Sequence, residues 1–325
     1  MHFDGSPSPF EHLLPDSRLD VEEYYMDLFF KTMIERQEIY HKKEILKQPY
    51  PWTEDKIFRE FKFTNVYREL DKNSRWEIEN IVINNDLTDE DRLFQILVFR
   101  AFNNPLFFEF IKERAGDIWE KGIPKYSDYH AKLFSMCIDK YRKQGKNPFT
   151  NSYVTNSKYC PGQSRDWCFG NRVIPEYHQQ TPQLLKFIIN SKTALECAQK
   201  LRELPSAGGF LAHEYYISLC YIGKYREESF FRWTEDDWTN VGPGASLGIR
   251  LIFPSLDTIK KQEQAIYWLR DISSSKLEEL GGFRYPYYYE KLTLHQIEFF
   301  LCEFGKYWRM LVGEGKTRQK YKHSL

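Results

Sequence analysis

The sequence predicts an all-α protein, and two observations lead to that prediction. Apolar residues recur at three- and four-residue steps along most of the 325-residue chain, which is the period of an amphipathic helix. Alternation of apolar and polar residues, which is typical of strands, is scarce, and residues 152–155 are the best candidate for a short strand. Aromatic residues form 17% of the chain, which excludes an intrinsically disordered protein because disorder requires few aromatic side chains.

The individual helices follow from this period and from the residues that cap helix ends. The first spans residues 19–45 with Asp20 as its N-cap, and another spans residues 89–103 after the cap Thr88. The other segments with helical spacing are 61–82, 127–143, 181–202, 208–222, 227–238, 256–271 and 293–311.

Two connections are rich in aromatic residues and have no helical period. They cover residues 144–180, which also hold many Gly, Pro and Asn, and residues 282–290. A connection as long as the first is usually functional or disordered in a compact domain. The aromatic content favours an ordered, functional segment.

Charge is balanced overall but unevenly distributed. The 46 basic and 46 acidic residues cancel, yet residues 1–25 hold six acids and one base, and residues 140–175 hold seven bases and one acid. Residues 301–325 hold six bases and two acids. The bases of 140–175 are interleaved with aromatic residues, which suits a phosphate backbone with unstacked bases; a solvated loop with ordinary surface lysines is the alternative. The aromatic residues are Tyr141, Phe149, Tyr153, Tyr159, Trp167 and Phe169.

Cysteine and histidine spacing predicts no structural metal. The six Cys are too sparse for a disulfide scaffold, and the closest pair, Cys160 and Cys168, is eight residues apart, which is not a usual zinc spacing. Neither a leader nor an apolar run long enough to span a membrane is visible in the sequence. We therefore expect a soluble cytoplasmic protein without a membrane partner.

The segment 238–253, WTNVGPGASLGIRLIF, predicts a helix-hairpin-helix turn. Gly242 and Gly244 would permit positive φ and close approach of the backbone to a phosphate. The N–H groups that open the following helix would then face the anion. Gly248 would allow close packing against another helix, and an ordinary tight turn is the alternative reading of the whole segment.

The segment 61–82 carries polar residues at steps of three and four, so that on a helix they share one face. Such a face could hold a diphosphate and a base, because the planar Arg fork pairs bidentately with phosphate oxygens. An exposed helix with intrahelical ion pairs is the alternative. The residues of this face are Asn65, Arg68, Asp71 and Arg75, with Tyr67 beside them.

The apolar helix 208–222 contains the polar residues His213 and Glu214. Burial of a carboxylate is costly unless it is paired, so Glu214 is predicted to be either surface-facing or functional. The motifs GxxxxGK[ST] and GxGxxG do not occur. Their absence removes phosphate-loop nucleotide kinases and Rossmann dehydrogenases from the leading candidates.

Five blocks, read in order, resemble a known family. They are FTNVYRELDKNSRW, PFTNSYV, GGFLAHEYYISL, WTNVGPGASLGIR and LTLHQIEFFLCEFGKY, and they lie between residues 61 and 310. They look like the blocks of the phage α-glutamyl/putrescinyl thymine pyrophosphorylases, the amino acid:DNA transferases of thymidine hypermodification. That family is similar in fold to the helix-hairpin-helix DNA glycosylases. The resemblance therefore implies an all-α, helix-hairpin-helix DNA glycosylase-like fold with long aromatic loops.

The reaction implied by this resemblance takes place on a base already in DNA. A transferase of this kind replaces the pyrophosphate of 5-pyrophosphomethyl-deoxyuridine in double-stranded DNA with an amine from an amino acid or a polyamine. A separate hydroxymethyluracil DNA kinase supplies the substrate, and in a bacteriophage the product aids restriction evasion in the host cytoplasm. No cofactor is implied, although Mg²⁺ bound through the pyrophosphate stays open. The alternatives are a glycosylase that excises a modified base, with Asp257 as its carboxylate, and a non-catalytic DNA-binding protein.

The resemblance also implies roles for individual residues. Arg68 and Arg75 would hold the pyrophosphate, Asp71 would orient them or act as base, and Glu214 would act at the amine. The substrate pocket would be framed by Asn65, Tyr67, Thr150, His213, Glu303 and Lys306. The DNA backbone would be bound by Gly242, Gly244, Ala245 and Arg250.

This chain departs from the family pattern at two places, which bear on amine specificity and activity. It has His213, Glu214 and Ser218 where Tyr-Gln and a following Asp are expected, and it has Gly305 where an acidic residue is expected before the lysine.

The organisation implied along the chain has three parts. A flexible segment covers residues 1–18, and a basic tail covers residues 313–325. A single catalytic domain covers residues 19–312, with two lobes around a DNA cleft as an alternative arrangement.

Overall fold

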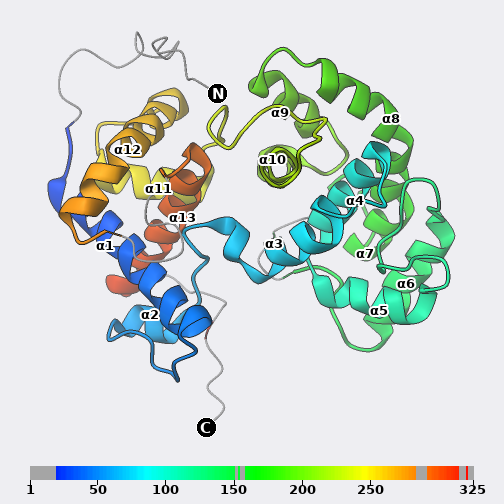
Figure 1. Ribbon diagram of the computed structural model, residues 1–325, viewed down its shortest axis with the longest axis horizontal. Coiled ribbons are helices and arrows are strands. Elements are labelled where there is room, and N and C mark those ends of the chain that lie inside the picture. Colours follow the sequence, from blue (N-terminus) through cyan, green and yellow to red (C-terminus); the bar gives the residue numbers. More distant parts are fainter. Residues whose placement is uncertain (1–19, 151–152, 154–157, 283–290, 315–319, 321–325) are drawn as a thin grey trace. The chain divides into compact units, whose positions relative to one another are not determined.

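The computed structural model describes residues 20–150, 153, 158–282, 291–314 and 320. Helices are the regular elements of these residues (Figure 1), and an isolated bridge between Phe61 and Lys320 is the one β-type pairing that the described residues form. The all-α prediction is confirmed. Of the candidate strand at 152–155, the structure describes Tyr153, which is not in a strand, and residues 283–290 of the predicted connection 282–290 lie outside the described residues.

The chain forms two compact units. The first, which we call the outer unit, comprises Met1–Arg68 and Thr239–Leu325. The second, the inserted unit, comprises Glu69–Trp238. Each has its own set of helices.

The outer unit is built around two closely packed helices. α11 (Pro243–Ile252) packs against α13 (Leu294–Leu311), and α1 (Glu23–Tyr40) and α12 (Ile259–Glu279) contact both. A short helix, α2 (Lys56–Glu60), contacts α13.

Glycines explain why α11 and α13 approach so closely. A Cβ on Gly248 would overlap the carbonyl oxygen of Leu301, and a Cβ on Gly305 would lie 3.1 Å from the carbonyl oxygen of Gly244. The predicted packing role of Gly248 is therefore confirmed. An acidic side chain at position 305 would collide with the backbone of α11, which explains in physical terms why this chain carries glycine there.

The inserted unit surrounds one central helix. Every residue of α4 from Asp91 to Phe102 is buried, and α4 contacts α8 and α10. Its start is fixed by a capping box in which Thr88 and Asp91 bond each other's backbone N–H groups. The helices of the unit are α3 (Lys72–Glu77), α4 (Asp89–Phe102), α5 (Pro105–Ala115), α6 (Ala131–Lys143), α7 (Arg165–Cys168), α8 (Ile174–Asn190), α9 (Ala194–Arg202) and α10 (Gly208–Tyr225).

Several predicted boundaries are wrong. Residues 61–67 are not helical, and the segment predicted as one helix over 61–82 begins with a 3-10 turn, Arg68–Leu70, before α3. Residues 227–238 contain no helix. The long connection ends at residue 164, where α7 begins after the N-cap Ser164.

Further differences concern helix ends. The predicted helix 181–202 is two helices that meet at residues 191–193, and α1 starts after Glu22 and not at Asp20. None of the helices in the described ranges is both long and apolar enough to cross a membrane.

We expect Gly248→Ala to lower the free energy of unfolding by about 1–3 kcal/mol, because the added methyl group must push α11 away from α13. Urea denaturation followed by circular dichroism measures this change. Gly242→Ala is the matched control, because its Cβ would meet only the Glu298 carboxylate at 3.7 Å; a loss there equal to that of Gly248→Ala would contradict the packing argument.

Candidate functional site

Arg68 is a buried cation in the outer unit. It is 8% exposed, and its guanidinium carbon lies 4.2 Å from the centroid of the Phe299 ring on α13. A cation over an aromatic face is stabilised by the ring quadrupole, and burial strengthens its field on any anion that reaches it. Asn65 and Tyr67, which precede it in the same non-helical segment, are also buried.

Two residues of α13 hold this segment in place. Glu303 accepts a hydrogen bond from the Thr64 backbone N–H at 3.1 Å, and Lys306 donates to the Lys62 carbonyl at 2.5 Å. Lys306 also pairs with Glu303 at 3.1 Å. These two predicted pocket residues therefore support the segment 61–68, which carries Asn65 and Arg68, by direct contact with its backbone.

The start of α11 differs from the predicted hairpin. Gly242 is its N-cap with φ −82°, and neither Gly242 nor Gly244 has positive φ, so that part of the prediction is wrong. Gly244 instead packs on Cys302 of α13, since a Cβ there would lie 3.0 Å from its sulfur. The Gly242 N–H donates to the buried carboxylate of Glu298 at 3.3 Å. A phosphate at this helix end would therefore compete with a carboxylate of the protein itself.

The two remaining predicted DNA contacts of α11 differ in exposure. Ala245 is fully buried, which leaves its side chain unable to touch DNA. Arg250 is exposed in the last turn of the helix.

Asp71 and Arg75 belong to the inserted unit. Asp71 is the N-cap of α3, and its carbonyl accepts the Arg75 backbone N–H at 2.9 Å. Arg75 is exposed, and Asp71 is half-buried. Because residues 61–67 are not helical and α3 starts only at Lys72, the predicted single helical face from Asn65 to Arg75 does not form.

Arg100 of α4 lies at the centre of a buried charge cluster in the inserted unit. Its guanidinium contacts Glu77 at 2.6 Å and Glu214 at 3.0 Å. It also donates to Ser218 at 2.6 Å and to the Tyr153 hydroxyl at 3.2 Å. All five residues are at most 6% exposed.

Burial and pairing act in opposite directions in this cluster. Burial raises the pKa of the Glu77 carboxyl, although the Arg100 guanidinium partly offsets that rise. Burial disfavours the charge on Arg100, but the carboxylate of Glu77, with further help from Tyr153 and Glu214, holds the Arg100 pKa well above its usual value. The prediction that Glu214 is surface-facing or functional missed a third outcome, which is that it is paired inside the core.

One sign of this cluster is visible in the sequence, since Arg100 occurs within the otherwise apolar run 96–102. Its partners are 23 and 114 residues away, so spacing could not reveal them. His213 is buried and precedes Glu214 on α10. Its ring makes an edge-to-face contact with the Trp238 ring, with 5.3 Å between the ring centroids.

Thr150 lines an open pocket of the inserted unit. The pocket has a volume of about 730 Å³, and its wall includes Glu109, Glu113, Arg114 and Lys146 from α5 and the loop after α6. The Thr150 N–H donates to the Phe102 carbonyl at 2.8 Å, which ties the start of the long loop to α4. The wall therefore carries both charge signs.

Asp257, the carboxylate of the glycosylase alternative, is on the surface. Its carboxylate pairs at 2.9 Å with the ammonium group of Lys261, which lies four residues later in the first turn of α12. The hydrogen bond from Lys261 lowers the pKa of this carboxyl. In the part of the chain that the structure describes, no three His, Cys, Asp or Glu side chains gather as metal ligands.

The described residues form a helical protein, and the family comparison identifies the kind of helical domain. Residues 23–317 match the family model of the 5-hmdU DNA kinase, helical domain, and the chain belongs to that family. A 5-hmdU DNA kinase of Bacillus phage SP10 is 25% identical over 296 residues, which is 89% of this chain and 45% of that relative. The chain thus spans about half the length of the curated relative it matches. No solved structure matches the chain.

The matched family differs from the one that the sequence blocks resemble. Both concern hypermodified thymidine in phage DNA, which the comparisons support. The matching family model is not that of the amine transferases. The protein named as a kinase is the phage SP10 relative, and this chain covers 45% of its length.

We expect Arg100→Met to lower the free energy of unfolding by about 3–5 kcal/mol, because it leaves two carboxylates buried without their cation. The loss should be smaller at pH 5 than at pH 8, since burial raises the pKa of Glu77 and a protonated Glu77 carboxyl needs no partner. Urea titrations at the two pH values measure it. Arg75→Met, on the exposed face of α3, should change stability by less than about 0.5 kcal/mol.

Glu235 should make stability depend on pH. Burial, followed by the nearby Glu69 carboxylate, raises the pKa of Glu235 to about 7, against an opposing effect of Lys224. A carboxyl with a raised folded-state pKa holds a proton that the unfolded chain has lost. Stability should therefore fall as pH rises from about 4.5 to 7, by up to about 1.4 kcal/mol per pH unit for one proton. Glu235→Gln should remove this slope and the exposed control Glu228→Gln should keep it; the same slope in both would contradict the assignment.

Proposed function

We propose that this chain acts on a thymine-derived base in DNA and replaces a pyrophosphate on its C5 methylene with an amine. Membership of a 5-hmdU DNA kinase domain family supports a DNA base as the substrate. The observation that carries the reaction is Arg68, a buried guanidinium fixed over Phe299 in a segment that α13 holds at two points.

The reaction requires stabilisation of the negative charge that develops on the departing pyrophosphate. The carbon–oxygen bond to pyrophosphate breaks and both electrons leave with the oxygen, while N1 of the pyrimidine pushes electron density toward the methylene carbon. The amine lone pair then forms the new carbon–nitrogen bond, and the amine gives up a proton to a base. A cation fixed in advance, away from water, stabilises the departing pyrophosphate without reorganisation. Arg68 meets that requirement better than the exposed Arg75.

The remaining roles follow from position. Asp71, at the start of α3 and three residues after Arg68, is our candidate for the base or for the group that orients the arginines. Glu214 is bound to Arg100, which supports a positioning role and not direct contact with the amine. Asn65 and Tyr67 would shape the pocket beside Arg68, and Arg250, exposed on α11, would contact the DNA backbone.

The substrate and its supply follow from this chemistry. The base must leave the duplex to reach a buried cation, so the partner is double-stranded DNA that carries 5-pyrophosphomethyluracil. A hydroxymethyluracil DNA kinase would have to act first, and an amino acid or polyamine would be the second substrate. Mg²⁺ would enter, if at all, with the pyrophosphate.

Mass spectrometry of nucleosides tests the proposal after incubation with pyrophosphomethyluracil DNA and candidate amines. We expect an amine adduct with the natural chain and at least a hundredfold less with Arg68→Ala, because a transition-state donor is lost. DNA binding by Arg68→Ala should stay nearly unchanged. Arg250→Ala is the matched control and should weaken DNA binding while adduct formation at saturating DNA persists. The absence of any adduct with every amine would sink the proposal.

A second candidate is a non-catalytic DNA-binding module. It is favoured by one observation, which is that the chain corresponds to about half of a kinase relative and to a model of its helical domain. Under this alternative DNA binds tightly without turnover, and Asp71→Asn changes nothing. An adduct that disappears in Asp71→Asn would decide for the transferase.

A further inference from the structure

The aromatic residues of the basic stretch 140–175 divide into two groups. Four are part of the core, where none exceeds 6% exposure: Tyr141, Phe149, Tyr153 and Phe169. The two others, Tyr159 and Trp167, are each 42% exposed. Tyr159 and Trp167 are therefore the aromatic side chains of this stretch on which a base at the surface can stack.

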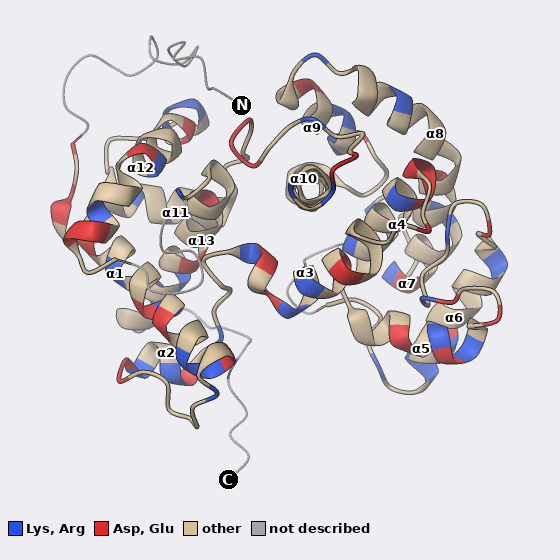
Figure 2. Cartoon of the chain, viewed as in Figure 1, with Lys and Arg blue, Asp and Glu red and all other residues tan. Residues whose placement is uncertain are grey.

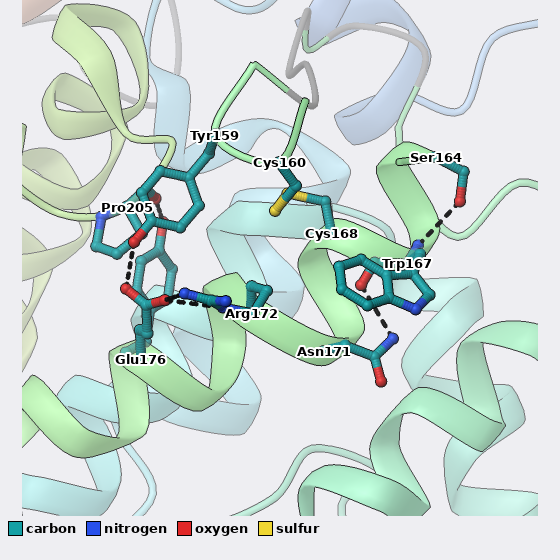
Figure 3. Close-up of a disulfide and its surroundings, with 10 residues drawn as sticks. Tyr159, Cys160, Ser164, Trp167, Cys168, Asn171, Arg172, Glu176 and Pro205 are labelled. Carbon is teal, nitrogen blue, oxygen red and sulfur yellow. Dashed lines mark hydrogen bonds and ion pairs between the residues drawn. A yellow bond between two sulfur atoms is a disulfide. The ribbon is translucent and has the colours of Figure 1, made fainter. Parts of the chain in front are cut away.

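Both exposed rings adjoin a disulfide in the chain, since Tyr159 precedes Cys160 and Trp167 precedes Cys168. Cys160 and Cys168 are bonded, with 5.7 Å between their Cα atoms, and Tyr159 and Trp167 lie on either side of the bond (Figure 3). Both cysteines are buried, Cys168 completely. The loop is thus fastened to the core at its ends, while the residues next to those ends face outward.

Hydrogen bonds fix the positions of the two aromatic residues. The Tyr159 hydroxyl donates to Glu176 of α8, which also pairs with Arg172 at 3.2 Å. The Trp167 backbone N–H donates to the N-cap Ser164 at 3.2 Å, and Asn171 donates to the Trp167 carbonyl at 3.0 Å. The Tyr159 ring is thus held by its hydroxyl and Trp167 by its backbone, and groups held in advance lose less conformational entropy when a partner stacks on them.

Basic side chains accompany this loop. Arg142 of α6 pairs with Asp166 at 2.6 Å, which joins the end of α6 to α7. That end of α6 also carries the exposed Lys140 and Lys143, and Lys158 is exposed at the start of the loop. Figure 2 shows basic residues along α6. Lys158 adjoins Tyr159 in the chain and Arg142 pairs with Asp166 beside Trp167, so a phosphate backbone would meet cations next to both rings.

We propose that the Cys160–Cys168 loop is a docking surface for single-stranded DNA, with unpaired bases stacked on Tyr159 and Trp167. The inference rests on the proposed function only in taking DNA as the partner. Bases within a duplex cover each other's faces, so an exposed protein ring can stack only on a base that has left its pair. Removal of a base from the stack produces such unpaired nucleotides close to the modified one.

Fluorescence anisotropy with a labelled oligothymidylate of about 15 nucleotides tests the inference, without reducing agent. We expect Trp167→Ala and Tyr159→Ala each to weaken binding about tenfold, as loss of one stacked base does. Trp167→Phe, which keeps a ring, should bind nearly as well as the natural chain. Tyr24→Ala, at a 68% exposed tyrosine of the outer unit, is the matched control and should have no effect. A duplex of the same length should respond less to Trp167→Ala than the single strand does.

Equal affinity of Trp167→Ala and the natural chain for the single strand would overturn the inference, as would an equal loss in Tyr24→Ala. Absence of measurable binding by the natural chain would overturn it too. Circular dichroism of each variant separates lost contact from lost fold, and Trp167→Phe provides the comparison where Trp167→Ala unfolds. The experiment uses unmodified DNA and no amine, so its outcome is independent of whether the transferase reaction occurs.

Discussion

The inserted unit depends on one buried cation. Arg100 joins four parts of the chain, namely α4, which carries it, α3 through Glu77, α10 through Glu214 and Ser218, and the long loop through Tyr153. Each ion would be costly to bury alone, so the arrangement is stable only when all partners are in place. An apolar core tolerates small shifts of its helices, whereas this geometry fixes the register of α3 and α10 on α4. The loop that carries the proposed stacking surface is thereby anchored to the centre of the unit.

In the outer unit, small residues fix how the helices pack. Gly248 and Gly305 bring α11 and α13 into backbone contact, and α13 then presents one line of side chains to the segment before Arg68. Phe299, Glu303 and Lys306 occur at steps of four and three along that helix, so a single helical face positions a stretch of chain that has no regular structure itself. This explains how a non-helical segment can hold a charged side chain rigidly enough for chemistry.

Sequence alone predicted the strongly periodic helices well. α4, α10 and α13 begin within one residue of the predicted positions, because the apolar period and, for α4, the capping box agree there. Residues 61–67 were predicted wrongly because polar residues at steps of three and four fit a helix, whereas Glu303 and Lys306, more than 230 residues away, hold the backbone in another conformation. The segment 227–238 was predicted wrongly for a similar reason, since Phe231 is buried and Trp233 and Trp238 pack against the core of the inserted unit. The spacing of Cys160 and Cys168 does not distinguish a disulfide from two free thiols, and it is the fold that brings their Cα atoms to 5.7 Å.

The ends of the inserted unit have a consequence for how such a chain can be assembled. Lys224, in the last turn of α10, bonds Glu69 at 2.6 Å and Glu235 at 3.7 Å. Glu69 is the first residue of the inserted unit, and Glu235 lies three residues before its last. One lysine side chain therefore bridges the place where the chain enters the unit and the place where it leaves. A segment with its two ends so close occupies no more room in a host chain than a short loop does. Residues 69–238 thus have the geometry of a module that can be gained, lost or exchanged while the helices on both sides keep their own packing.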